Sequence, residues 1–192
     1  TPAFSNLNVG LSGTNVAKDG VYAGWHGERW TTKAGLPTGI YGVKAVALDG
    51  RIYAVGGYNS GNQASNYQYD PTANAWTSKA SMPTARHSLS LGALNGRVHA
   101  AGGESTSILA THQEYDPAAN AWTSRQSLPA AHAQAAGVVY DGRFHLFGGV
   151  VFSGSVSGQY ASYDQTSGTW QVHAPMPDAR QESGVELFGG QV

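Results

Sequence analysis

Three side chains that can carry positive charge recur at nearly even spacing. Arg86, His132 and Arg180 follow one another at intervals of 46 and 48 residues. A guanidinium group binds a carboxylate or a phosphate through two parallel hydrogen bonds. If the fold brings these three positions together, we expect a site for a carboxylate, a phosphate or an acidic peptide. The alternative is that Arg86 and Arg180 pair with Glu182 and Asp178 across loops.

Further polar and aromatic side chains accompany these three. His87 follows Arg86 directly, Gln134 and Glu182 stand at equivalent places in the repeat, and Tyr58 and Glu104 each follow a Gly-Gly pair. No G-x-S-x-G, H-E-x-x-H or P-loop motif is present, so no catalytic residue can be assigned. The candidate ligand-binding residues are Arg86, His87, His132, Gln134, Arg180, Glu182, Glu104 and Tyr58.

The sequence gives little reason to expect a metal site or redox chemistry. The absence of Cys excludes disulfides and thiolate metal sites. His99 and His145 occupy one repeat position, but equivalent places in different units need not be near each other. We therefore interpret both as packed, hydrogen-bonded histidines, and we expect no metal site and no cofactor.

The composition predicts a packed domain without strong electrostatic attraction to polyanions. Apolar residues make up 41% of the chain and five residues are Trp, which argues for a core although only 12% of residues are charged. The net charge of −1 gives no reason to expect nucleic acid or an anionic membrane as a partner. No apolar run approaches the roughly 18 residues of a membrane span. The Gly-rich, Lys-poor composition resembles that of exported bacterial proteins and suggests a secreted or periplasmic location.

The chain repeats itself at an almost constant interval. "YDPTANAWTSKASMP" (69–83) returns as "YDPAANAWTSRQSLP" (115–129). A repeat of this length indicates stacked supersecondary units, each too small to bury its apolar face alone. The recurring positions include Trp30, Trp76, Trp122 and Trp170, and the pairs Gly56-Gly57, Gly102-Gly103 and Gly148-Gly149.

Each repeat predicts four short strands. In the unit 86–131 the expected strands are "SLSLGAL", "RVHAAGG", "THQEYD" and "AWTSRQ". The "NG" between the first two predicts a type I′ hairpin turn, which needs positive φ at both central residues. A Gly-Gly pair in a strand is costly unless a neighbouring backbone or large ring lies against it, and the recurrent Trp and Tyr are the expected rings. The recurrent turn residues Asp70, Asp116 and Asp164 are interpreted as structural, together with Arg51, Arg97 and Arg143.

The succession of hairpin, Gly-Gly pair, Tyr, Trp and Pro resembles the kelch repeat. The match is good over residues 39–192 and poor over 1–38. The resemblance implies an all-β, kelch-type β-propeller of about four four-stranded blades in a single domain. The expected units are 39–85, 86–131, 132–179, and a first unit made of 1–38 plus 180–192, in which N- and C-terminal strands share a sheet and close the ring. The alternative is a fragment or half-ring that completes itself as a homodimer.

The kelch resemblance also implies where a ligand would bind. In such propellers the first strand is innermost, so the residues that precede it should open at one mouth of the central channel. Arg86, His132 and Arg180 would then converge there, and the loops that follow the Gly-Gly pairs would lie on the same face. The expected function is a binding module for a protein segment or a glycan, recognised through an anionic group.

Two other functions remain open on the same resemblance. One is a small sugar-active enzyme similar to sialic-acid mutarotases, with Glu182, Glu104, His132 and Arg180 as acid and base groups. The other is a structural fragment of a larger propeller. The copper chemistry of kelch proteins that resemble galactose oxidase needs a Cys, so the sequence excludes it.

Overall fold

The computed structural model describes residues 32–151 and 154–185, which consist of β-strands, turns and loops. Ala34–Val192 form one compact unit. Within the described residues no helix is long and apolar enough to cross a membrane. Most of the predicted first unit, 1–38 with 180–192, lies outside the described residues. Ring closure by the two ends of the chain therefore stays a prediction.

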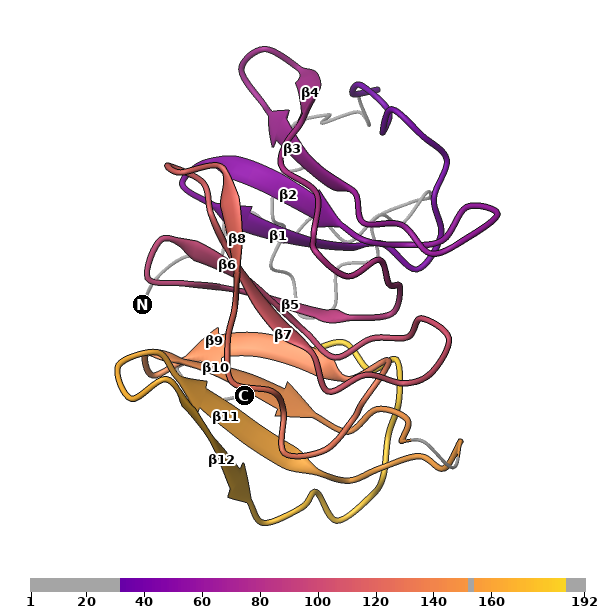
Figure 1. Cartoon of the computed structure of the whole chain (residues 1–192), viewed down its shortest axis with the longest axis vertical. Helices are drawn as coiled ribbons and strands as arrows, with labels where there is room; N and C mark the ends of the chain where they lie inside the picture. The colour runs from indigo at the N-terminus through magenta and orange to yellow at the C-terminus, as the bar shows by residue number, and fades with distance from the viewer. Residues whose placement is uncertain (1–31, 152–153, 186–192) are drawn as a thin grey trace, which may run out of the picture. The chain divides into compact units, whose positions relative to one another are not determined.

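The described strands form three four-stranded antiparallel sheets, each in chain order, which we number as blades (Figure 1). Blade 1 contains β1 (Lys44–Leu48), β2 (Arg51–Val55), β3 (Asn66–Asp70) and β4 (Ala75–Ser78). Blade 2 contains β5 (Ser90–Leu94), β6 (Arg97–Ala101), β7 (His112–Asp116) and β8 (Ala121–Ser124). Blade 3 contains β9 (Ala136–Tyr140), β10 (Arg143–Phe147), β11 (Tyr160–Asp164) and β12 (Thr169–His173). The predicted all-β architecture with four strands per unit is confirmed for these three units.

The turn between the first two strands of each blade has the predicted backbone. In blade 2, Asn95 and Gly96 have φ of 48° and 73°. Asp49-Gly50 and Asp141-Gly142 also have positive φ at both residues. This is the left-handed pair that a type I′ turn requires, and its twist suits the two strands that it joins.

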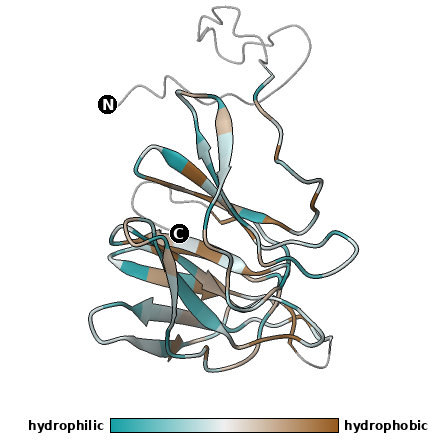
Figure 2. Cartoon of the chain, turned by 45° about the horizontal axis from the view of Figure 1, so that its top comes forward, coloured by the Kyte–Doolittle hydropathy of each residue, from teal (hydrophilic) through white to brown (hydrophobic). Residues whose placement is uncertain are grey.

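The first strands of the blades lie next to one another, and the core fills the spaces between blades. β5 packs against β1 on one side and β9 on the other. One apolar cluster joins blades 1 and 2, including Val55 and Leu89, and a second joins blades 2 and 3, including Leu94 and Phe144. Figure 2 shows hydrophobic and hydrophilic segments alternating along several strands. Each fully buried side chain of this size contributes about 1.5–3 kcal/mol.

The Gly-Gly pairs are explained by the backbone of the next repeat unit. The second glycine donates its N–H to the carbonyl of the residue at the Arg86 position: Gly57 to Arg86 (3.0 Å), Gly103 to His132 (2.8 Å) and Gly149 to Arg180 (2.7 Å). A Cβ atom on the first glycine would lie 2.3–2.5 Å from that same carbonyl oxygen. The expectation that Trp and Tyr rings cover these glycines is wrong, because a carbonyl group makes the close approach.

The recurrent Trp residues also connect neighbouring units. The indole N–H of Trp122 donates to the Ala80 carbonyl (2.7 Å), and that of Trp170 donates to the Gln126 carbonyl (3.0 Å). Each ring packs beside a Tyr of its own blade, with centroids 5.2 Å apart for Tyr115–Trp122 and 5.3 Å for Tyr163–Trp170. A large ring at this place therefore fixes both the outer half of a blade and its attachment to the preceding blade.

The recurrent Asp residues are structural, as predicted. Asp70, Asp116 and Asp164 each accept two backbone N–H bonds from the turn that follows. Each also forms an ion pair of 2.7–3.2 Å with the predicted Arg of its own blade. Backbone N–H groups, chiefly that of Ala73 for Asp70 and that of Ser167 for Asp164, hold the pKa of the Asp70 and Asp164 carboxyl groups below the usual value.

Candidate functional site

One face of the described blades is built from paired loops, which we name the loop rim (Tyr41, Tyr58, His87, Glu104, Ala133 and Val150). In every blade a residue before the first strand exchanges two backbone hydrogen bonds with the residue after the Gly-Gly pair. These bonds are 2.8–3.1 Å for Tyr41–Tyr58, 2.8–3.0 Å for His87–Glu104 and 2.7–3.0 Å for Ala133–Val150. The rim residues are therefore held at fixed positions although they lie in loops.

A second set of loop residues is named the mouth ring (Gly42, Ser88, Gln134 and Glu182). Gly42, Ser88 and Gln134 lie two residues before β1, β5 and β9, and Glu182 holds the same repeat position. All four have positive φ, from 51° to 63°. The N–H of Ser88 donates to the Gly42 carbonyl, that of Gln134 to the Ser88 carbonyl, and that of Glu182 to the Gln134 carbonyl, at 2.8–3.0 Å. A left-handed conformation costs about 1–2 kcal/mol outside glycine, and the hydrogen bonds between blades offset that cost.

The mouth ring lies at the end of a hollow between the first strands. The hollow has a volume of about 150 Å³ and is lined by residues of β1, β5 and β9, including Lys44, Ser90 and Gly137, together with Ser183 and Val185. Its position fits the central channel that the kelch resemblance implies. Gly184 and its neighbours stand where the first strand of a further unit would begin, because Glu182 continues the mouth ring.

Arg86 is not at the open mouth, which corrects the sequence-based prediction. Its side chain is completely buried between blades 1 and 2. The guanidinium donates to Gln113 Oε1 (2.6 Å), to the Ala100 carbonyl (3.0 Å) and to the Thr84 carbonyl (3.1 Å). Burial lowers its pKa to about 10, so it stays charged at neutral pH. These bonds attach the side chain to β6, β7 and its own loop and leave no exposed surface for a ligand, while the Arg86 backbone bonds to Gly57 and Gln63 connect it to blade 1.

His132 and Arg180 do not join Arg86 in one open cluster. His132 is buried, with Nδ1 3.0 Å from the Ala130 carbonyl and Nε2 3.5 Å from Ser157 Oγ. Burial lowers the pKa of its imidazole, so it is neutral at physiological pH. The Arg180 side chain is 64% exposed and lies 3.6 Å from Asp178, as the alternative prediction proposed for this arginine. The expected convergence of three cationic groups is therefore wrong.

The other candidate residues belong to the loop rim or to the mouth ring. Tyr58, His87 and Glu104 belong to the loop rim and are half-buried, while Gln134 and Glu182 belong to the mouth ring. The structure adds two residues that the sequence reasoning missed, Tyr41 and Ser88. Tyr41 holds the repeat position of His87, and Ser88 holds that of Gln134, so aligning the residues before each first strand would have found both.

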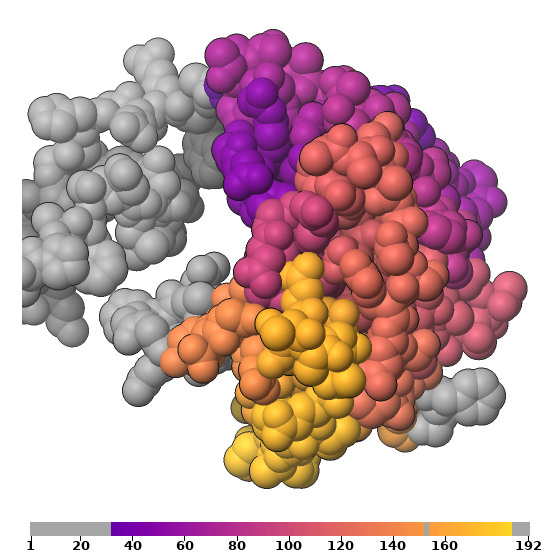
Figure 3. All heavy atoms as spheres, turned by 60° about the vertical axis from the view of Figure 1, so that its left-hand side comes forward, coloured from indigo at the N-terminus to yellow at the C-terminus, as the bar shows by residue number. Residues whose placement is uncertain are grey.

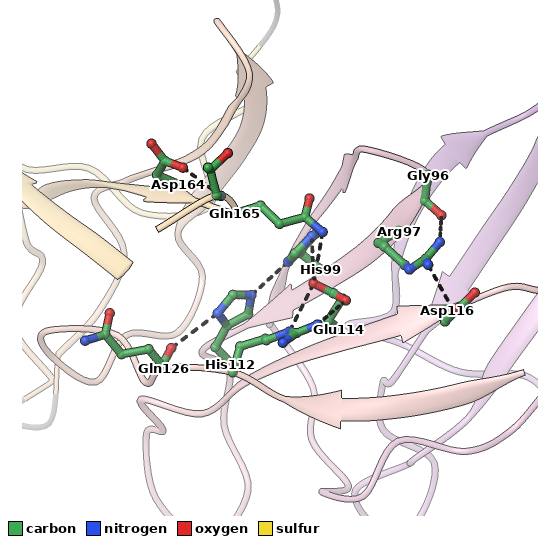
Figure 4. A network of polar contacts seen from close by, with 11 residues as sticks. Gly96, Arg97, His99, His112, Glu114, Asp116, Gln126, Asp164 and Gln165 are labelled. Carbon is green, nitrogen blue, oxygen red and sulfur yellow. Dashed lines mark hydrogen bonds and ion pairs between the residues drawn. The ribbon is translucent and has the colours of Figure 1, made fainter. Parts of the chain in front are cut away.

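A buried polar network lies between blades 2 and 3 (Figure 4). His99 Nδ1 is 3.0 Å from His112 Nε2, and His112 Nδ1 is 3.3 Å from the Gln126 carbonyl. His99 Nε2 lies 3.5 Å from the Glu114 carboxylate. Arg125 donates two hydrogen bonds of 2.8 and 3.1 Å to the same carboxylate. His99 is thus a packed, hydrogen-bonded histidine, as predicted, while His112 and Glu114 were not identified from the sequence.

Desolvation controls the charge of this network. It lowers the pKa of His99 to about 4 and that of His112 to about 3, so both imidazoles are neutral in the folded protein at pH 7. Glu114 is the nearest anion, but its charge is already paired with Arg125. Within the described residues no group of three or more His, Asp or Glu side chains could hold a metal ion.

Comparisons with known proteins agree with this architecture. The model of the kelch motif matches residues 40–83, which span blade 1. Among 169 matching chains of solved structures is one described as "Structure of YjhT", with a TM-score of 0.69 and 19% sequence identity. The match covers 80% of this chain and 57% of that one. No curated protein matched the sequence.

The kelch match and the blades lead to one conclusion. Blades 2 and 3 repeat the strand order, the hairpin turn and the Gly-Gly contact of the matched blade 1. The similarity to the solved structure, at its low identity, concerns the fold alone. The chain has the β-propeller fold, and residues 40–83 within it match the kelch motif.

Proposed function

We propose that this chain belongs to a binding propeller, and that the loop rim and the mouth ring hold its ligand. The observation that carries the proposal is the rigid pairing of Tyr41 with Tyr58 and of His87 with Glu104 by backbone hydrogen bonds. Residues on loops that a rigid scaffold fixes are where binding sites are commonly found. The whole protein's ligand is also a matter of proposal, because the chain spans 57% of the solved structure that it matches.

The chemistry of the rim favours a neutral polar ligand over a strongly anionic one. The anionic preference expected from the sequence depended on Arg86, and that guanidinium is buried. Arg180 is exposed, but Asp178 is beside it. Rim side chains such as Tyr58, His87 and Glu104 offer hydrogen bonds and ring surfaces instead. We therefore propose a glycan or an uncharged polar peptide segment as the ligand.

The mutarotase-like alternative receives less support from the geometry. It needs acid and base groups at the mouth, and His132 was one of them. That imidazole is buried and hydrogen-bonded, with its pKa lowered by burial. Glu104 follows β6 and Glu182 lies after blade 3, and among the described residues the imidazole of His132 is bonded to the Ala130 carbonyl and Ser157 instead. We therefore propose a binding function in preference to a mutarotase-like activity.

Screening the full chain against glycan and peptide arrays tests the proposal. Hits should be mapped by backbone NMR, and the largest shifts are expected at the loop rim and the mouth ring. The variant Tyr58→Ala should weaken binding. Thr72→Ala is the control, because Thr72 is exposed in the turn after β3, at the other end of that sheet from the rim. Shifts confined to the turns around Thr72 and Asn95 would overturn the proposed location.

A further inference from the structure

Three aromatic rings from two blades meet on the loop rim, and we name them the aromatic platform (Tyr41, Tyr58 and His87). Ring centroids are 5.2 Å apart for Tyr41–Tyr58, 5.6 Å for Tyr58–His87 and 6.4 Å for Tyr41–His87. These separations are typical of rings in direct contact. The ring planes are inclined by 37° for Tyr41–Tyr58 and by 68° for Tyr58–His87, so the rings form a tilted cluster that crosses from blade 1 to blade 2.

One ring of the platform, Tyr41, is exposed, and its backbone is held in place. Tyr41 is 65% exposed, the highest value among the large apolar side chains that the structure describes as exposed. Two-way backbone bonds fix Tyr41 to Tyr58, and the same bonds fix His87 to Glu104. Because Tyr has few rotatable bonds, it supplies a large contact area at a low cost in conformational entropy.

Hydrogen-bonding groups surround the platform. The backbone of Glu104 forms a β-bridge with that of His87, and the backbone of Asn62 forms one with that of Tyr58. The Asn62 amide donates to Ser105 Oγ at 3.4 Å, and its Oδ1 is buried, so this side chain supports the rim and does not face a ligand. The exposed Tyr41 ring on the same rim as the half-buried Glu104 matches a ligand with one apolar face and a polar edge.

Blade 3 has no equivalent of the platform. At the repeat position of Tyr41 and His87 it carries Ala133, and at that of Tyr58 it carries Val150. The backbone pairing is the same, at 2.7–3.0 Å, so the scaffold does not require aromatic rings there. The rings of blades 1 and 2 therefore serve something other than the fold.

We propose that Tyr41, the exposed ring of the aromatic platform, stacks against the apolar C–H face of a neutral pyranose ring, with the Glu104 side chain bonding its hydroxyl groups. A pyranose has this combination of an apolar face and a hydroxyl edge, and it carries no charge that would need Arg86. This inference rests on the proposed function of the rim and names its ligand class.

The test uses the full chain and a panel of neutral methyl pyranosides with gluco, galacto, manno and N-acetylglucosamine configuration, together with their short oligomers. Binding is followed by calorimetry and by saturation-transfer NMR. Tyr41→Ala should weaken binding at least 10-fold, and Tyr41→Phe should leave it unchanged because the ring remains. Tyr140→Ala is the matched control, since Tyr140 is exposed on blade 3, away from the rim.

The outcomes separate this inference from the proposed function. If a pyranoside binds at the rim and only Tyr41→Ala weakens it, both stand. If a peptide binds at the rim but no pyranoside does, the function stands and the sugar class is overturned. Equal losses with Tyr41→Ala and Tyr140→Ala, or no loss with either, overturn the platform. If nothing from the arrays or the panel perturbs the rim, the proposed function itself fails.

Discussion

The two interfaces between blades share one backbone design but are filled with different chemistry. Between blades 1 and 2 the side chains are apolar and aromatic, with Tyr53 and Tyr115 in contact at 5.9 Å, and Arg86 is the buried charge. Between blades 2 and 3, His99 and His112 lie against Tyr163, with ring centroids 4.5–5.6 Å apart. In Figure 3 blade 2 lies between the other two blades, so it presents one face to each interface.

The difference shows what the repeat must keep and what it can vary. Both interfaces keep the glycine N–H bonded to a carbonyl of the next blade and the indole N–H bonded to a carbonyl of the preceding blade. Side chains at equivalent positions change freely: Tyr53 becomes His99, and Asn66 becomes His112. The backbone contacts therefore define the fold, while the side chains decide how each interface responds to mutation and pH.

The largest effect should come from removing the buried cation of the first interface. Arg86→Ala leaves Gln113 and the Ala100 carbonyl without a donor and opens a cavity, so we expect a loss of about 3 kcal/mol in the free energy of unfolding. Arg180→Ala at the same repeat position should cost less than about 0.5 kcal/mol, because that side chain is exposed. Urea unfolding measures both. Similar losses for the two variants would show that burial does not distinguish them.

The shared Gly-Gly contact should be the next most sensitive feature. Gly102→Ala places a Cβ 2.3 Å from the His132 carbonyl oxygen and should destabilise the second interface by about 2 kcal/mol more than Gly96→Ala. Gly96 is the matched control, since its φ is also positive but no atom lies within 4 Å of the added Cβ. Thermal unfolding of the two variants separates steric contact from backbone strain. Equal melting temperatures would mean that the carbonyl can move away at no cost.

Acid should weaken the second interface through its two buried histidines. Because their folded pKa values of about 4 and about 3 lie below the ordinary 6.5, the unfolded chain takes up protons first as the pH falls. Their contribution to the free energy of unfolding is complete above pH 6.5. It is lost as the pH falls from 6.5 towards the folded pKa values of about 4 and about 3. We expect a loss of about 2 kcal/mol between pH 7.5 and 5.5.

A double substitution tests whether His99 and His112 cause the pH effect. It replaces them with the residues found at the same repeat positions in blade 1. His99→Tyr with His112→Asn introduces the residues found at Tyr53 and Asn66, and it removes both titrating groups from this interface. The pH dependence of the free energy of unfolding should become shallower in this variant. An unchanged slope would assign the acid sensitivity to His132 and His145, whose pKa values burial also lowers.

The smallest effect should come from the indole hydrogen bonds. Trp122→Phe and Trp170→Phe each remove one hydrogen bond to a carbonyl of the preceding blade, and each should cost about 1 kcal/mol. Similar costs in the two interfaces would show that this contact belongs to the repeat itself. If only Trp170→Phe destabilises the protein, contacts of that ring with His112 and Phe144 are the cause.

Much of the fold could be predicted because its signals are local. Asn95-Gly96 predicts its own turn, since the backbone of those two residues needs no distant partner. The spacing of the Trp residues and of the Gly-Gly pairs predicted repeated blades, although the atom that approaches Gly102 is a carbonyl oxygen and was expected to be a ring. The fourth, shared blade stays a prediction, and the mass of the protein in solution would distinguish a closed monomer from a homodimer.

The candidate site was harder to predict because it depends on where side chains point. Alignment of the repeats placed Arg86, His132 and Arg180 at one position, and their backbone carbonyls do perform one role. Their side chains have three different environments, since Gln113 accepts from Arg86 while Asp178 lies beside an exposed Arg180. Glu114 and His112 were missed because their partners come from other strands and from the neighbouring blade.

By itself the sequence determined the repeat, the hairpin turns and the strand order, because these follow from backbone conformations that a few neighbouring residues impose. The tertiary structure alone decided which charges are buried and which rings are exposed. Desolvation depends on every atom packed around a group. Arg86 and Tyr41 show this in opposite directions: a charged side chain that was predicted to bind a ligand is buried, and a tyrosine that the sequence analysis did not single out is exposed.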